Sequence, residues 1–258
     1  MIHYFRLLNI RLLVLVFLSL HASITLAQTD LPTQSAALKF MPPKRIQANY
    51  DVMKNGKPFA KVYELFVLAD NAYKVESVTK GIGVYALLGE RKLTSTGVLT
   101  AQGLKPNHFE LHQGDNPKKA LFADFDWESN TLHMLVKGKV NDVSLAQGSQ
   151  DLASYAYQFM FLSAPLNDAI TVTLTTGKKL NQYTYQINTD QEALALTADS
   201  GAIIQYKTVH LQLDQVKPQS ESKELWLASE RYYLPVRILI VDENGEKIEQ
   251  TLTDLHVE

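Results

Sequence analysis

Three residues in the middle of the chain have the types and the spacing of metal ligands. His108, Glu110 and His112 alternate with Phe109 and Leu111. Alternate residues of a β-strand share one face, so two imidazoles and a carboxylate would point the same way, as a metal site requires. No fourth ligand is nearby in the sequence, and a polar outer face opposite an apolar inner face explains the same pattern. His108, Glu110 and His112 are therefore weak metal candidates, and we expect no cofactor.

A second group, Asp124, Asp126 and Glu128, also alternates on one face of a predicted strand. Paired carboxylates can perform acid–base catalysis or glycoside cleavage when they are held a set distance apart. The apolar side chains of Phe125 and Trp127 lie between them, so a solvated outer face is the simpler interpretation. The sequence lacks a Gly-x-Ser-x-Gly elbow, a His-Glu-x-x-His pair and a phosphate-binding glycine loop. We therefore expect no enzyme.

Large aromatic residues form a third group of candidates. Concave apolar sites lined by aromatic side chains bind small molecules, although the same residues can simply fill a core. Tyrosine suits the wall of a pocket, because its ring is apolar while its hydroxyl needs a polar partner. We take four residues as candidate ligand-binding side chains: Tyr155, Phe159, Trp226 and Tyr233.

The elements that must position these residues are mostly strands. Segments of period-two alternation, separated by turns, recur at roughly ten-residue intervals from residue 45 onward, which is typical of an all-β sheet or barrel. Asn55-Gly56 and Asn244-Gly245 predict tight hairpins. Apolar residues at helical spacing predict one buried helix within Asp151 to Ser163. The expected fold is mainly β, a curved antiparallel sheet or incomplete β-barrel with one central α-helix.

Arg237 lies on an otherwise apolar segment near the C-terminus. A charged side chain in that environment must find a partner or reach the edge of the fold. Glu224 and Glu249, on the neighbouring predicted strands, are the candidate partners.

The first residues predict export. A basic start with Arg6 and Arg11 precedes an apolar run from Leu12 to Leu20, and Ala27 ends a small-residue cleavage pattern. The run is too short to span a bilayer. We predict a signal peptide over residues 1–27, a flexible leader over 28–44, a single β-rich domain over 45–258 and a periplasmic location. The chain has no cysteine, so its stability must come from a packed core.

Composition limits the partners. The chain has 25 Lys and Arg residues against 27 Asp and Glu residues, a net charge of −2. A mildly acidic protein without a basic cluster is a poor nucleic-acid binder. We interpret the lysine pairs Lys118-Lys119, Lys137-Lys139 and Lys178-Lys179 as solvated turns. The processed protein is expected not to be an integral membrane protein.

Several short motifs resemble a known family. They are Tyr50 with the Gly56 hairpin, Thr96-Gly97 with the Gly103-Leu104-Lys105-Pro106 turn, Gln150-Asp151, and the distinctive run from Trp226 to Arg237. Together they are similar to the exported bacterial family called domain of unknown function 3108, over nearly the whole processed chain. That resemblance implies no activity and no functional residues. More distantly, the arrangement is similar to periplasmic lipoprotein carriers, whose half-open barrel takes acyl chains against a helical lid.

These observations favour a non-catalytic periplasmic binding or carrier module for an apolar or amphipathic envelope component such as a lipid. One alternative is an envelope scaffold that pairs with a protein partner through a sheet edge. The other is a hydrolase that uses the acidic face near Asp124.

Overall fold

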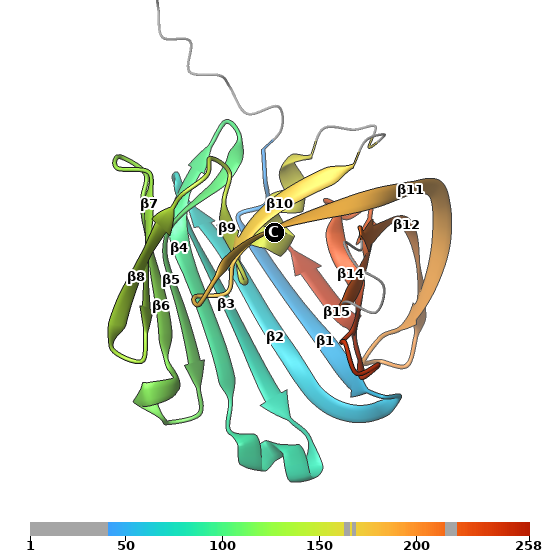
Figure 1. Cartoon of the computed structure of the whole chain (residues 1–258). Helices are drawn as coiled ribbons and strands as arrows, with labels where there is room; N and C mark the ends of the chain where they lie inside the picture. The colour runs from blue at the N-terminus through green and yellow to red at the C-terminus, as the bar shows by residue number, and fades with distance from the viewer. Residues whose placement is uncertain (1–40, 163–165, 167–168, 215–220) are drawn as a thin grey trace, which may run out of the picture. The chain divides into compact units, whose positions relative to one another are not determined.

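One sheet contains the fifteen strands of the described residues, in the order β8-β7-β6-β5-β4-β3-β2-β1-β15-β14-β13-β12-β11-β10-β9 (Figure 1). Neighbours run antiparallel, except that β9 is parallel to β10. The strands are β1 (Arg45–Lys54), β2 (Lys57–Ala69), β3 (Ala72–Gly81), β4 (Arg91–Thr100), β5 (Gly103–Gln113), β6 (Leu121–Asp126), β7 (Thr131–Val136), β8 (Lys139–Ser144), β9 (Gln150–Asp151), β10 (Ile170–Thr175), β11 (Leu180–Thr197), β12 (Ile203–Leu213), β13 (Ser222–Ala228), β14 (Leu234–Val241) and β15 (Lys247–Val257).

This computed structural model describes residues 41–162, 166, 169–214 and 221–258, without the side chains of residues 189–191. They belong to one compact unit, Ala36–Glu258. The predicted signal peptide and residues 28–40 of the predicted leader lie outside the described residues. Within these residues, no helix is long and apolar enough to cross a membrane.

Alternation along each strand decides which side faces the core. On β5, Phe109 and Leu111 point inward, while the histidines and Glu110 between them remain partly exposed. The Asn55-Gly56 turn has positive φ at both residues, which is the backbone conformation that an Asn-Gly hairpin adopts. The mainly β prediction is therefore confirmed.

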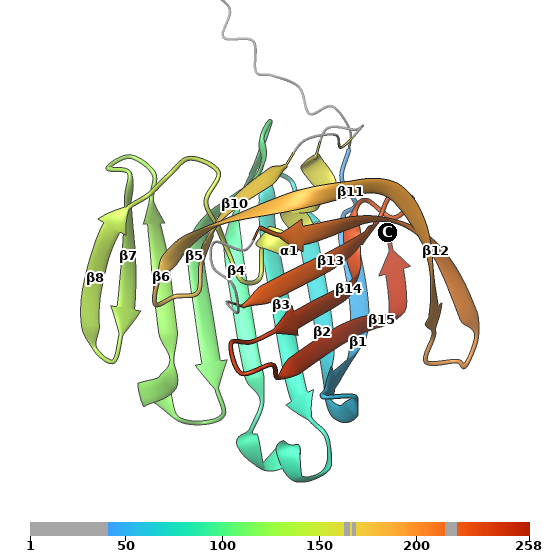
Figure 2. The same ribbon diagram turned by 45° about the vertical axis from the view of Figure 1, so that its right-hand side comes forward.

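The sheet curls until its two ends approach each other. Figures 1 and 2 both show β10 and β11 crossing over the concave side of β4 to β6. At the turn between them, a Cβ on Gly177 would lie 3.0 Å from Leu121 Cβ, and the residue has a φ of +78°. Glycine allows both the approach and this backbone conformation. The incomplete barrel expected from the sequence is confirmed.

The central helix is much shorter than predicted. The helical part consists of α1 (Tyr155–Gln158) and the 3₁₀ turn η3 (Phe159–Phe161). Asp151 does not begin a helix, because it pairs with β10 as part of β9, and its carboxylate accepts hydrogen bonds from the Ala153 and Ser154 N–H groups. The predicted helix over 151–163 is thus wrong in length, and Ser163 lies outside the described residues. Two further 3₁₀ turns are η1 (Gly83–Leu88) and η2 (Pro117–Lys119).

Strand β13 has apolar groups on both sides. Leu225 and Leu227 pack in one cluster with Tyr155 and Phe159, whereas Trp226 packs in another with side chains of β1, β2, β12, β14 and β15. Arg237 pairs with Glu249 at 2.7 Å and lies 4.4 Å above the Trp226 ring, so its predicted pairing is confirmed.

Candidate functional site

Two adjoining cavities lie on the concave side of the sheet. The inner one has a volume of about 230 Å³ and lies between strands β1 to β4, the α1 region and strands β13 to β15. The outer one has a volume of about 630 Å³ and lies between strands β4 to β7 and the β10–β11 turn. Arg91 and Leu152 line both cavities, so the two spaces meet at these side chains.

Among the described residues, Glu64 alone places a carboxylate in the wall of the inner cavity. It accepts hydrogen bonds from Tyr157 Oη and Ser77 Oγ, each at 3.1 Å. Burial raises the pKa of this carboxyl, although the two hydroxyl donors partly oppose the shift. Tyr155 also lines this cavity, and burial raises the pKa of its phenol above the usual value. The inner cavity therefore combines aromatic rings with a carboxyl group that is partly desolvated.

Two cations face the same space from opposite sides. Lys223 is buried, with Nζ 4.7 Å from the centre of the Tyr155 ring. Burial raises the pKa of Tyr185 to about 12, and the positive charge of Lys223 partly opposes that shift. Burial lowers the pKa of the Arg91 guanidinium. Neither cation forms an ion pair within the part of the chain that the structure describes.

The outer cavity has an apolar floor and a basic rim. Leu111, Leu121, Val136 and Leu152 supply apolar wall. Lysines from three separate turns reach the same cavity: Lys118, Lys119, Lys137 and Lys178. Among the described residues, none of these lysines has a carboxylate within ion-pair distance. These lysines are exposed in or beside turns, as predicted from the sequence, and folding also brings at least one member of each pair to the edge of one cavity.

A sequence match that extends from β1 to β15 identifies the family of this chain. Residues 46–253 match the family described as "Protein of unknown function (DUF3108)". The chain belongs to this family. No curated protein sequence matches it.

Two solved structures resemble this DUF3108 chain. A β-barrel-like protein of domain of unknown function DUF1849 from Brucella abortus aligns with a TM-score of 0.54 and 12% identity, over 84% of this chain and 99% of its own. That likeness supports the barrel-like fold alone. A DUF1329 family protein from Desulfovibrio piger aligns at a TM-score of 0.21 and 10% identity, over 84% of this chain and 86% of its own, and carries no argument.

The four predicted ligand-binding residues occupy different environments in this DUF3108 fold. Tyr155 lines the inner cavity. Phe159 is fully buried beside it and contacts the Tyr155 ring edge-on. Trp226 stacks on His210 in the cluster on the other side of β13, and Tyr233 lies in the turn before β14 with a φ of +53°. Tyr233 packs against the cluster that contains Tyr155 and Phe159, so the structure brings these three residues together and leaves Trp226 on the opposite side of its strand.

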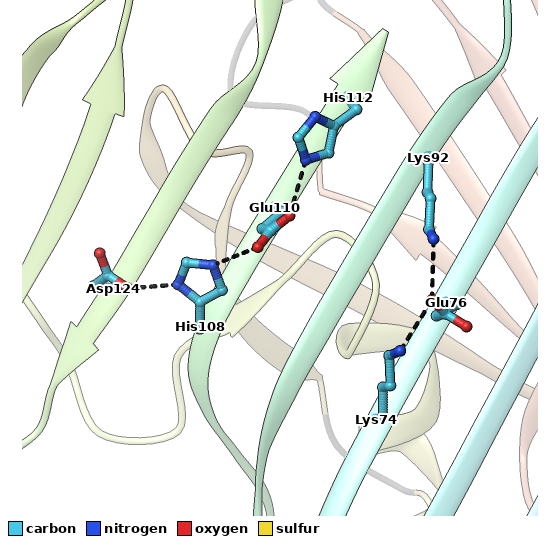
Figure 3. Close-up of polar contacts among 7 residues, drawn as sticks. All are labelled: Lys74, Glu76, Lys92, His108, Glu110, His112 and Asp124. Carbon is cyan, nitrogen blue, oxygen red and sulfur yellow. Dashed lines mark hydrogen bonds and ion pairs between the residues drawn. The ribbon is translucent and has the colours of Figure 1, made fainter. Parts of the chain in front are cut away.

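The metal candidates lie on the convex side of the sheet (Figure 3). His108 hydrogen-bonds to Asp124 through Nδ1 and to Glu110 through Nε2, and His112 bonds to the other Glu110 oxygen. These nitrogens and oxygens face one another and do not converge on a common point. No group of three or more histidine or acidic side chains among the described residues is arranged to hold a metal.

The acidic face near Asp124 is likewise occupied by structural contacts. Asp124 pairs with His108, and Asp126 accepts hydrogen bonds from the N–H groups of Glu128 and Ser129 in the following turn. Ala123 and Phe125 point into the core. This arrangement explains the alternation by hydrogen bonding and packing.

Sequence reasoning missed the charged residues of the cavity walls. Each of these charged residues lies on the same side of its strand as buried apolar residues. Glu64 shares that side with Val62 and Phe66, Arg91 with Leu93, and Lys223 with Leu225 and Leu227. A charged residue on the apolar side of a predicted strand was therefore the signal that could have found all three. The rim lysines had no such signal, because they come from distant turns.

Proposed function

We propose that the protein is a non-catalytic binding module, exported to the periplasm, that carries an amphipathic envelope component with an anionic head. The observation that carries this proposal is the pair of adjoining cavities, the outer one lined by leucine and valine, and both bordered by cations that form no ion pair with a described carboxylate. Export rests on the basic start, the apolar run and the cleavage pattern of residues 1–27.

Size and chemistry both support such a ligand. The outer cavity of about 630 Å³ falls within the range of roughly 300–1,000 Å³ that is typical of small-molecule sites. Leucine and valine side chains would contact an acyl chain, and burying apolar ligand surface there is favourable. Arg91 and the lysines would pair with a carboxylate or phosphate, which relieves the cost of leaving the Arg91 charge half-buried and unpaired.

The alternatives have weaker support. The sheet ends in two short edges among the described residues: β8, a six-residue strand with exposed Lys139 and Asp142, and β9, a two-residue strand that pairs only with Leu174 and Thr175 of β10. Short edge strands, and charged side chains on them, discourage the addition of another strand. A hydrolase would need a nucleophile or water near Asp124, but Asp124 is engaged with His108 on the convex side. We therefore favour binding over both scaffolding and catalysis.

A fluorescent fatty-acid probe tests the proposal directly. We expect the fatty acid to bind with micromolar affinity, about −8 kcal/mol, and its methyl ester to bind more weakly because the ester lacks the negative charge. The variant Tyr155→Ala with Phe159→Ala should weaken binding more than it lowers the free energy of unfolding. Absence of binding by the wild-type protein would defeat the carrier proposal.

Matched charge variants locate the head of the ligand. Lys119→Gln with Lys178→Gln removes two cations of the cavity rim. The control Lys57→Gln with Lys247→Gln removes two exposed lysines, at the β1–β2 and β14–β15 turns, that form no ion pair with described residues. Both variants change the net charge equally. Equal affinities for the fatty acid would show that the basic rim does not bind its head.

A further inference from the structure

An exposed apolar turn projects from the end of the sheet next to the outer cavity. Val84, Leu87 and Leu88 of η1 are 76%, 90% and 60% exposed, and η1 has no buried residue. Figure 1 shows η1 and η2 at the same end of the sheet, at the bottom of the view. Exposed apolar groups gathered in this way on a soluble surface usually mean contact with a partner.

Contacts connect this turn to the basic rim. Gln113 donates a hydrogen bond to the Leu88 carbonyl, and Gly114 donates its N–H to the Glu90 carbonyl. Gln113 lines the outer cavity together with Lys118 and Lys119. The acidic residues next to these contacts include Glu90, which is already paired with Lys80, and Asp115; Glu246, near the other side of η1, is paired with Lys54. The apolar turn is therefore flanked by cations in excess.

We propose that this end of the molecule, the η1 turn with Lys118 and Lys119, docks on a lipid bilayer that contains anionic lipids. The leucine side chains would enter the interfacial region while the lysines contact lipid phosphates, and each basic residue near an anionic surface adds to the attraction. Docking in this way places the mouth of the outer cavity at the membrane. The proposal does not depend on the ligand that the cavity takes.

The small size of the apolar turn favours a bilayer over a protein partner. Even aromatic side chains bury only roughly 150–250 Å² each. Three aliphatic side chains therefore supply much less than the roughly 800 Å² per partner that a stable protein interface buries. A bilayer surrounds a projecting turn on all sides and adds an electrostatic contribution from its anionic lipids.

Vesicle co-sedimentation tests the proposal with protein taken as cells produce it, after any processing of residues 1–27. Intact mass identifies the form used, since an uncleaved apolar segment would bind vesicles itself. We expect binding to phosphatidylglycerol vesicles and much weaker binding to phosphatidylcholine vesicles. Leu87→Ser with Leu88→Ser should reduce binding about tenfold or more, which is about 1.4 kcal/mol. Lys118→Gln with Lys119→Gln should also reduce it and should weaken its dependence on salt.

The control is Ile203→Ser, which removes another apolar side chain, 71% exposed, from β12 in the other half of the sheet. It should bind vesicles like the wild type. Docking on lipid is overturned if the wild type does not bind anionic vesicles, if the η1 variant and the control bind equally, or if the two vesicle types bind equally. A stable dimer that the η1 variant loses, without vesicle binding, would likewise overturn it in favour of a second copy of the chain.

Discussion

Arg91 and Lys92 are neighbours on β4 that face opposite sides of the sheet. On the convex side, Lys92 and Lys74 both lie 3.1 Å from Glu76 (Figure 3). On the concave side, Arg91 lies between two cavities and has no ion-pair partner among the described residues. An exposed ion pair needs no explanation beyond local surface chemistry, since it contributes little to stability. An unpaired half-buried cation costs free energy, so a ligand is the simplest reason to keep it.

The same contrast holds for carboxylates. On the convex side, Glu110 lies between two histidines, whose hydrogen bonds lower its pKa against the opposing effect of burial. On the concave side, the hydrogen bonds that Glu64 and Asp151 accept from described residues come from hydroxyl and N–H donors. Lys74, Lys92 and Glu110 on the convex side thus have partners of opposite charge or protonatable partners, whereas Arg91 and Glu64 on the concave side form no ion pair with another described residue.

The largest predicted difference between the two sides concerns packing. Phe109 on β5 is fully buried, while Phe122 on β6, next to Ala123 and paired with Glu110, remains partly exposed. Phe109→Ala should lower the free energy of unfolding by about 3–5 kcal/mol. Phe122→Ala should lower it by about 1 kcal/mol, because this partly exposed ring makes its aromatic contacts with two surface imidazoles, those of His108 and His112. Urea unfolding measures both values, and equal losses would show that the concave side is not the core.

The next largest effect is the pH dependence that comes from Asp151. Burial raises the pKa of this carboxyl to about 6, despite hydrogen bonds from Ser95 Oγ and from backbone N–H groups. Because the folded-state pKa lies above the unfolded value, the contribution of Asp151 to stability is complete below about pH 4 and is lost as the pH rises through about 6. At about 1.4 kcal/mol per pKa unit, the loss amounts to roughly 3 kcal/mol.

Asp151→Asn keeps the shape of the side chain and removes the titration. Urea unfolding at a series of pH values between 4 and 7 should show a smaller decrease in stability for this variant than for the wild type. A wild-type curve that does not fall across this range, or a variant with the same slope, would contradict the assignment.

A smaller effect is expected for ligand affinity and compares the two neighbours on β4. Arg91→Gln should weaken binding of the fatty-acid probe about tenfold, or about 1.4 kcal/mol, if the head of the ligand pairs with the guanidinium. Lys92→Gln should leave affinity unchanged, since Lys92 faces Glu76 on the other side of the strand. Both variants lose one positive charge, so a difference between them cannot come from net charge. Equal affinities would show that Arg91 does not contact the ligand.

Features of the fold that depend on residues close together in the sequence could be predicted, and features that depend on distant residues could not. Strand alternation and Asn-Gly turns are local, so the β class and the hairpins could be predicted from the sequence. The pairing of Arg237 with Glu249 was within reach because the two strands are joined by a hairpin. The length of the helix was not, because Asp151 is held in β9 by β10 and by Ser95, which lie in distant parts of the chain.

The candidate site depended even more on long-range packing. The aromatic spacing found Tyr155 and Phe159, which do lie together at the concave side. The basic rim required the β10–β11 turn to cross over β6, so that Lys178 approaches Lys119 from a segment about sixty residues away. No local pattern in the sequence specifies that crossing, since it depends on the curvature of the whole sheet.

The smallest predicted effect belongs to the convex side and concerns His108. Burial lowers the pKa of this imidazole, but the hydrogen bonds and charges of Asp124 and Glu110 together outweigh burial and raise the pKa overall. A raised folded-state pKa means that the network stabilises the protein fully below about pH 6.5 and that this stabilisation is lost as the pH rises through the folded-state value. The side chains of His108, Glu110 and Asp124 are about one-third exposed or more, so solvent screening limits the contribution of this network to the free energy of unfolding to about 0.5 kcal/mol. His108→Gln should therefore flatten the stability curve slightly above about pH 6.5, and added salt should reduce the difference between variant and wild type. A change as large as that expected for Asp151→Asn would mean that the convex network stabilises the fold as strongly as the concave side, and the distinction between the two faces would fail.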